Sequence, residues 1–277
     1  MLLASVYLRA SQDHPLSPKA EADFYSSIET SNKTKKATAA GRLASVDTKF
    51  FETLDRLNLR PSTVMDVGVS SGQTTIDWLE AFKAHKRRIE MIATDYVMDV
   101  YIHSLGRGIA AIAEPNGHLL QIELLGIPIR TYKRRRDYLI GGWIWRRLLC
   151  SFVRFKLASA ERQGPFKLVT PQLRGNPGVL LLNDDILANN PAHLVRRADV
   201  VRIANLMQSI YFTEEQMKRA ASNIRERCRG EGSLVIVCRD YRGQVDCSIM
   251  RLTKRHKFIV EARLGRGSEA EPYFVEA

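Results

Sequence analysis

Residues 62–79 read S-T-V-M-D-V-G-V-S-S-G-Q-T-T-I-D-W-L. The first part is a short apolar run at 63–67, which is typical of a buried strand. Two glycines four positions apart follow it, Gly68 and Gly72, with only small side chains between them apart from Val69. From Thr75 onward, apolar residues recur at helical spacing. The stretch therefore predicts a strand, a tight glycine turn and a helix, in which the backbone of the turn can approach a ligand closely.

The pattern Asp66-x-Gly68-x-Ser70-x-Gly72 resembles motif I of the class I S-adenosylmethionine-dependent methyltransferases, with Ser70 in place of the usual middle glycine. The resemblance implies an α/β fold: a Rossmann-like, seven-stranded, mostly parallel sheet with helices on both faces and an antiparallel last strand. It also implies S-adenosyl-L-methionine as the cofactor, held in part by these four residues. The spacing does not fit the G-x-G-x-x-G fingerprint of dinucleotide binding. An ordinary strand-to-helix turn without a ligand is the alternative.

Asp95 ends a second apolar run at 89–94, about two dozen residues after the glycine turn. In nucleoside-binding α/β folds, an acidic residue at this place accepts hydrogen bonds from the ribose hydroxyls, and a carboxylate suits a vicinal diol because it has two acceptor oxygens. We expect Asp95 to bind the ribose and Tyr96 to lie against the adenine. The alternative for Asp95 is a helix cap or a loop residue.

Two further strand ends carry polar residues. A short apolar run at 179–182 precedes Asp184 and Asp185, and the resemblance implies that one of them, with Asp185 favoured, accepts from the adenine amino group. A cap of a short following helix is the alternative role. The run 199–206 predicts a strand that ends near Asn205, at the carboxyl edge where such sheets bind ligands. Thr213 and Gln216 then form a capping box that predicts a helix.

The resemblance extends over residues 42–100 and 179–265, which include a fifth strand at 233–238 and a closing hairpin of 247–252 with 258–264. We expect residues 1–40 to form a loose N-terminal arm with one short helix near 20–28. Residues 41–277 then form the methyltransferase domain, with an insertion at about 100–178 that carries acceptor recognition. Asn116-Gly117 predicts a hairpin of 108–113 with 119–124 inside that insertion.

The chain has a net charge of +12, and its basic residues are most concentrated at 130–156. Trp143, Trp145, Phe152 and Phe155 lie among them. A basic helix with such residues on one face is typical of a helix that lies on an anionic membrane. A helix that packs its apolar face on the core and leaves its arginines in solvent is the other interpretation.

Methyl transfer mainly requires that the acceptor be aligned with the methyl group, and oxygen or nitrogen acceptors also require a proton acceptor. His103 and Tyr211 are the candidates for that catalytic role. We expect a small-molecule, lipid or glycan acceptor. A nucleic-acid (RNA) methyltransferase that uses the basic surface and a non-catalytic membrane-surface module are the alternatives.

The four cysteines lack zinc-like spacing, so we expect reduced thiols, no metal site and a cytoplasmic protein, with membrane association as an alternative. We expect no transmembrane span, because the sequence has no apolar run of sufficient length.

Overall fold

The computed structural model describes residues 2–10, 17–33, 36, 39–132, 142–241 and 243–275. They form two compact units, each built from two segments of the chain. The first unit contains Met1–Thr38 and Val97–Gly175, and the second contains Ala39–Tyr96 and Asn176–Ala277. None of the helices in the described ranges is both long and apolar enough to cross a membrane.

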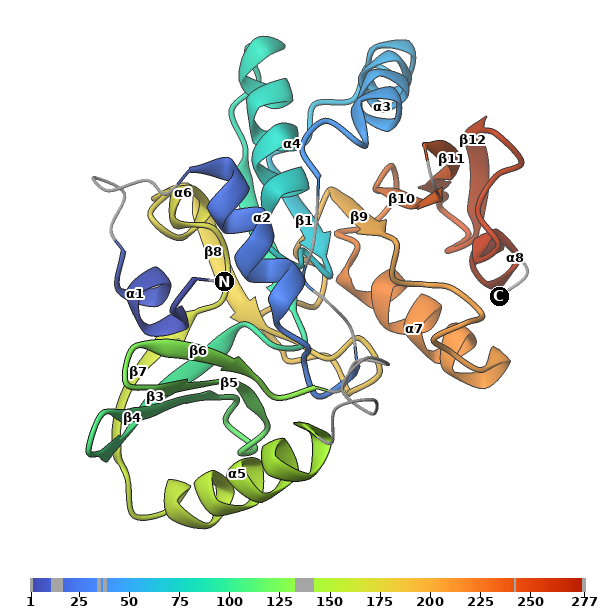
Figure 1. Cartoon of the computed structure of the whole chain (residues 1–277). Coiled ribbons are helices and arrows are strands. Elements are labelled where there is room, and N and C mark those ends of the chain that lie inside the picture. Colours follow the sequence, from blue (N-terminus) through green and yellow to red (C-terminus); the bar gives the residue numbers. More distant parts are fainter. Residues whose placement is uncertain are drawn as a thin grey trace. The chain divides into compact units, whose positions relative to one another are not determined.

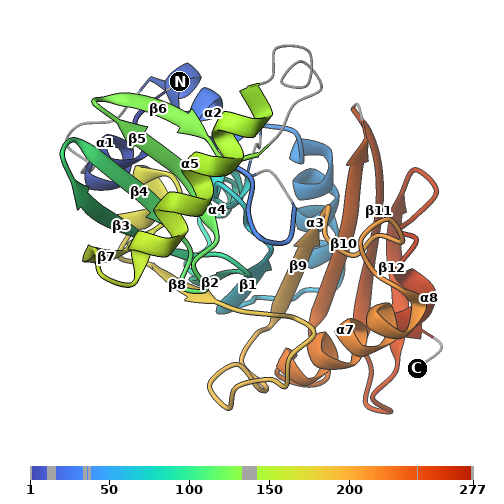
Figure 2. The same ribbon diagram turned by 60° about the horizontal axis from the view of Figure 1, so that its bottom comes forward.

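The second unit is built on a seven-stranded sheet with the order β12-β11-β10-β9-β1-β2-β8 (Figures 1 and 2). Its strands are β1 (Thr63–Val67), β2 (Glu90–Asp95), β8 (Val179–Asn183), β9 (Val200–Ala204), β10 (Leu234–Tyr241), β11 (Gln244–Leu252) and β12 (Phe258–Leu264). Neighbouring strands are parallel across β10, β9, β1, β2 and β8. Strand β11 is antiparallel to β10, and β12 is antiparallel to β11. The fold is Rossmann-like, as the sequence predicted.

Helices cover both faces of this sheet. Helix α7 (Glu214–Arg227) packs on one face, where Val201 and Ile203 of β9 join its core. Helices α3 (Ala44–Arg56) and α4 (Gln73–Ala84) cover the other face with an aromatic cluster. The predicted capping box of Thr213 and Gln216 begins α7, and the short helix α8 (Glu271–Val275) packs beside α7 and β12. Successive residues of β9 alternate between the two faces, so Arg202 points toward α4.

The first unit contains a five-stranded antiparallel sheet with the order β6-β5-β4-β3-β7. Its strands are β3 (Asp99–Gly106), β4 (Ile109–Ala113), β5 (Leu119–Leu124), β6 (Ile127–Arg130) and β7 (Glu161–Lys167). Strands β4 and β5 form the predicted hairpin, with Ile109 opposite Leu124. Helix α5 (Gly142–Leu157) packs on one face of the sheet, and the one-turn helix α6 (Pro171–Arg174) follows β7.

The N-terminal segment differs from the predicted loose arm. Helices α1 (Ala4–Arg9) and α2 (Pro18–Ser27) pack on the face of the five-stranded sheet opposite α5. Tyr7, Phe24 and Tyr25 are buried there, and the hydroxyl groups of the two tyrosines are 2.7 Å apart. The burial of these three aromatic rings joins the segment to the insertion, so the first unit begins near the start of the chain. The parts of the predicted arm at 11–16, 34–35 and 37–38 lie outside the described residues.

Candidate functional site

The glycine turn between β1 and α4 is tied to the end of β2. Gly68, Ser70 and Gly72 all have positive φ, at 75°, 57° and 87°. The backbone N–H groups of Gly68 and Val69 both donate to the Thr94 carbonyl, at 2.8 and 3.1 Å. A Cβ on Gly68 would lie 3.0 Å from the Leu206 Cδ2. The backbone angle and the contact with Leu206 therefore both favour glycine at 68.

Asp95 ends β2 beside this turn. Its Oδ2 accepts a hydrogen bond of 2.7 Å from the Ser70 backbone N–H, and its side chain is partly exposed. Its backbone carbonyl accepts from the Asp184 N–H at 2.9 Å, which ties in the end of β8. Tyr96, the next residue, is 50% exposed. Successive hydrogen bonds thus bring the glycine turn, Asp95 and the loop after β8 to one edge of the sheet.

The two aspartates after β8 have different surroundings. The carboxylate of Asp184 accepts two hydrogen bonds from the Arg227 guanidinium, at 2.6 and 2.9 Å, and both side chains are buried. Asp185 is exposed, and its Oδ1 accepts from the Leu187 N–H at 2.9 Å in a turn. Arg227 therefore holds Asp184 inside the fold and leaves Asp185 as the acidic side chain at the surface.

Asp66 lies in the interior, beneath the glycine turn. Its Oδ1 accepts from the Arg202 Nε at 3.0 Å, and its Oδ2 accepts from both an Arg202 Nη at 2.7 Å and the Thr75 hydroxyl at 2.7 Å. Thr75 belongs to the first turn of α4. Both oxygens of Asp66 are thus bonded within the protein, and the residue joins β1 to β9 and to the start of α4.

Arg202 is the centre of a buried charged network. It also contacts Asp47 at 3.3 Å and lies 4.1 Å from the centroid of the Trp78 ring. Burial raises the pKa of Asp47 to about 6, against the opposing effect of Arg202. Burial works against the charge of Arg202 as well, but Asp66 and Asp47 raise its pKa above the usual value. Two carboxylates therefore keep this guanidinium charged inside the protein.

Asn205 and Tyr211 follow β9. Asn205 has a positive φ of 56°, and its Oδ1 accepts from the Asp240 N–H at 2.7 Å. Its side chain therefore links the ends of β9 and β10. Tyr211 lies in the loop before α7 and is 53% exposed.

His103 lies on β3 in the first unit. It is 9% exposed, and burial together with the nearby Arg162 lowers its pKa. The imidazole is therefore neutral at pH 7, the form that accepts a proton.

The sequence analysis gave no role to Arg202 or Arg227. In the structure each arginine forms hydrogen bonds with an aspartate that the sequence analysis proposed for cofactor binding. The sequence contains a clue to the role of Arg202. An arginine inside the apolar run V-V-R-I-A needs a buried carboxylate as its partner, and Asp66 is an acidic residue inside another apolar run, 63–67. Arg227 carries no such signal, since it lies in the last turn of a helix, where basic residues are common at the surface.

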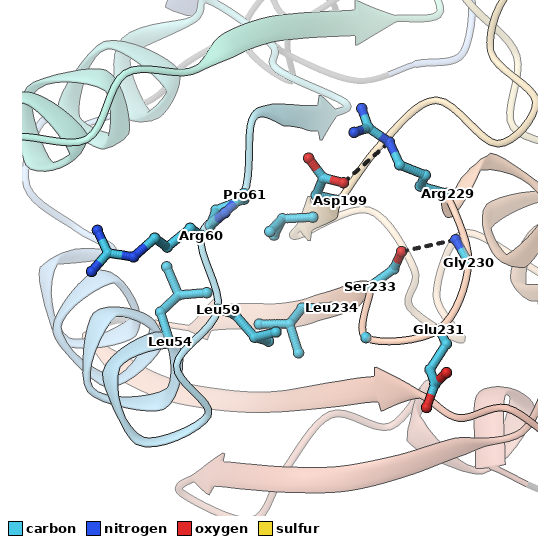
Figure 3. A pocket seen from close by; sticks show the side chains of 12 residues that line it. Leu54, Leu59, Arg60, Pro61, Asp199, Arg229, Gly230, Glu231, Ser233 and Leu234 are labelled. Carbon is cyan, nitrogen blue, oxygen red and sulfur yellow. Dashed lines mark hydrogen bonds and ion pairs between the residues drawn. The ribbon is translucent and has the colours of Figure 1, made fainter.

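A hollow of about 300 Å³ lies at the opposite, amino-terminal edge of the sheet (Figure 3). Arg229 lies on its wall, with its Nε 3.2 Å from the Asp199 Oδ1, and the Gly230 N–H donates to the Ser233 hydroxyl at 3.2 Å. The start of β9 and the start of β10 border it. This hollow is therefore distinct from the edge that carries Asp95.

Comparison of the sequence with protein-family models and with curated proteins returns no match. Solved structures that resemble the chain include methyltransferases. The N-methyltransferase NodS from Bradyrhizobium japonicum, solved with S-adenosyl-L-homocysteine, has 10% identity and a TM-score of 0.36, with 79% of this chain and 71% of that chain covered. A protein-L-isoaspartate O-methyltransferase described as putative, from Plasmodium falciparum, has 12% identity and a TM-score of 0.37, with 86% and 76% covered.

The CMeT domain of the citrinin polyketide synthase has 12% identity and a TM-score of 0.32, with 64% of this chain covered. The chain spans only 28% of the length of that protein. At these TM-scores the likenesses add no weight, and the assignment of a Rossmann-like fold rests on the strand order of the second unit.

Proposed function

We propose that the protein is an S-adenosylmethionine-dependent methyltransferase that binds its cofactor at the carboxyl edge of the seven-stranded sheet. One observation carries the proposal: the Ser70 N–H of the motif I turn donates to Asp95, the acidic residue that ends β2. The strand order reverses direction between β1 and β9, and ligands of open α/β sheets bind outside the carboxyl ends of the strands at such a point.

The residues at this edge fit a nucleoside. The carboxylate of Asp95 has two acceptor oxygens, which is the geometry that suits a ribose diol. Tyr96 presents half of its ring surface beside it. Asp185 is the exposed acid that suits the adenine amino group, while Gly68, Ser70 and Gly72 form a bend of small residues for the amino-acid end.

Three of the candidate cofactor residues act through others in this proposal. Asp66 fixes the glycine turn by holding Arg202 and Thr75, and Asp184 fixes the loop that presents Asp185. Asn205 joins β9 to β10 and so sets the path of the chain past Gly68, where Leu206 makes contact. These are positioning residues, whereas Asp95, Tyr96 and Asp185 touch the cofactor.

When bound, S-adenosylmethionine supplies a methyl group on a cationic sulfur that is a good leaving group. The protein then has to align an acceptor and, for oxygen or nitrogen acceptors, remove a proton. We propose a small-molecule, lipid or glycan acceptor, with its recognition carried by the insertion at about 100–178. Tyr211 and the neutral His103 are the proposed proton acceptors.

Isothermal titration calorimetry with S-adenosylmethionine and S-adenosylhomocysteine tests the proposal. We expect wild type to bind both ligands and Asp95→Ala to bind each about ten- to a hundred-fold more weakly, because hydrogen bonds to a charged group are lost. Glu231→Ala is the matched control, since Glu231 is an exposed acid of the same unit at the opposite edge of the sheet. If wild type binds neither ligand, or if the two variants behave alike, the proposal is wrong.

A further inference from the structure

Helix α5 has two apolar sides. One side packs on the five-stranded sheet, where Cys150 and Val153 are buried against Ala111, Ala113 and Ile122. The other side is solvent-exposed, and five of its large hydrophobic side chains have the following exposed fractions: Ile144 50%, Trp145 69%, Leu148 60%, Phe152 49% and Phe155 80%. The sheet accounts for only one of these sides.

The exposed residues form a continuous stripe along the helix. Positions 144, 148, 152 and 155 follow the helical repeat, and 145 borders them, so the five side chains occupy an arc of about 100°. Figure 2 shows α5 lying along one face of the sheet that contains β3, β4 and β5. We call these five residues the α5 stripe.

The borders of the α5 stripe are positively charged. Arg147 and Arg154 are exposed along one border, and Lys156 is exposed along the other. The sequence of α5 contains no aspartate or glutamate. A partner that covers the stripe therefore has to offer apolar surface together with negative charge on both sides of it.

We propose that the α5 stripe docks on the surface of an anionic lipid bilayer, an inference that does not rest on the proposed enzymatic function. A bilayer offers acyl chains for the rings and anionic headgroups for the cations, and a helix lying in the interface buries an apolar face of this kind. A second copy of the chain fits less well, because two stripes in contact would bring the cations of both helices together without any carboxylate of α5.

The side chains are suited to this depth. Trp145 and Phe155 are the most exposed members of the stripe and enter the boundary between headgroups and acyl chains. Arg147, Arg154 and Lys156 have long apolar stems that run along the helix while their charged ends reach the lipid phosphates. The net charge of +12 adds attraction at longer range.

Sedimentation with vesicles tests the proposal. We expect the full chain to sediment with vesicles of phosphatidylcholine containing phosphatidylserine, to sediment much less with phosphatidylcholine alone, and to be released by high salt. The tryptophan emission should shift to shorter wavelength on binding, because Trp145 leaves water.

Two sets of variants separate the apolar and the charged contributions. The double variant Trp145→Ser/Phe155→Ser should lose at least about ten-fold in binding, because both rings remain in water. The triple variant Arg147→Gln/Arg154→Gln/Lys156→Gln should lose about five-fold per cation. The side chains substituted in these two variants are all exposed. The circular dichroism spectrum and the melting temperature of each variant should therefore match those of wild type.

The chain offers matched controls for both sets. Val6→Ser removes an exposed apolar side chain from α1, on the other face of the same sheet. Lys254→Gln/Arg255→Gln/Lys257→Gln removes three exposed cations from the turn between β11 and β12. Val6→Ser should bind vesicles like wild type, and the charge control should lose much less binding than the α5 triple variant, because it weakens only the long-range attraction.

Three results would overturn the proposal: no sedimentation with anionic vesicles, equal loss of binding in the control variants, or equal binding to neutral vesicles. Analytical ultracentrifugation covers the competing occupant. A dimer of wild type that becomes monomeric in Trp145→Ser/Phe155→Ser, without any vesicle binding, would assign the stripe to a second copy instead. Methyl-donor binding is independent of all these readouts, so either proposal can fail alone.

Discussion

The interior of the second unit and the carboxyl edge of its sheet both contain aspartates, but the carboxylates have different surroundings. Inside, Asp66 and Asp184 each accept hydrogen bonds from a fully buried arginine. At the edge, Asp95 and Asp185 accept from backbone N–H groups and remain partly or largely exposed. Buried carboxylates need charged partners, whereas exposed ones can accept a ligand. We therefore expect mutations inside to affect folding and mutations at the edge to affect binding.

The largest loss of stability should come from Asp66→Ala. The change leaves Arg202 buried with Asp47, at 3.3 Å, as its one remaining charged partner among the described residues, and it removes the acceptor of the Thr75 hydroxyl. Breaking a buried ion pair from one side costs about 3–5 kcal/mol. Urea unfolding measures the loss, and Asp95→Ala is the matched control at the edge. Equal unfolding free energies for the two variants would remove the distinction between interior and edge.

Asp184→Ala should cost a similar amount, about 3 kcal/mol or more, because Arg227 is fully buried and would lose its carboxylate partner while keeping its bond to the Asn190 Oδ1, at 2.7 Å. The double variant Asp184→Ala/Arg227→Met tests the cause, since it removes the unpaired charge as well. We expect it to recover part of the stability in the same urea titration. A double variant less stable than Asp184→Ala would show that packing around Arg227, rather than its charge, sets the cost.

The pH dependence of stability should identify Asp47. Its pKa in the folded protein is about 6, above the ordinary value, because burial outweighs the attraction of Arg202. The folded state then binds more protons than the unfolded state between the two pKa values, so stability falls as pH rises from about 4 to 6. The contribution is at most about 3 kcal/mol. Asp47→Asn should flatten this part of the stability curve, whereas Asp55→Asn, an exposed change on the same helix, should leave it as in wild type.

Gly68→Ala should cost about 1–3 kcal/mol, because alanine is strained at a φ of 75° and its Cβ would meet Leu206. Gly117→Ala is the matched control, since it also has positive φ, at 82°, but open space around the position of a Cβ. The difference between the two melting temperatures measures the contact with Leu206. Only Gly68→Ala should also weaken S-adenosylhomocysteine binding.

The sequence predicted the parallel strands well because their apolar runs end in Gly, Asp or Asn, as at Gly68, Asp95 and Asn205. It did not reveal β7, which is an edge strand of mostly polar residues with Pro165 inside it, so it lacks any alternating pattern. It also left α1 outside the fold, because the sheet residues that cover Tyr7, such as Val100 and Ile112, lie far along the chain.

The roles of the site residues were harder to predict than the strands. The sequence identified the four aspartates by position and favoured Asp185 over Asp184. The sequence could not show which carboxylates are buried and which are exposed. The arginines that pair with Asp66 and Asp184 come from β9 and α7, far along the chain. That distinction requires three-dimensional contacts.

The smallest effect on stability, and the sharpest test of the comparison, should come from Asp185→Ala. The variant loses one exposed hydrogen bond to the Leu187 N–H, which is worth about 0.5–1 kcal/mol. If Asp185 accepts from the adenine amino group, the same variant binds S-adenosylhomocysteine about ten-fold more weakly, whereas inosine-containing analogues, which lack that amino group, bind wild type and variant alike. Calorimetry with both ligands separates the two effects. A variant that loses stability like Asp184→Ala, or that binds both ligands like wild type, would mean that Asp185 shapes its loop and does not recognise the base.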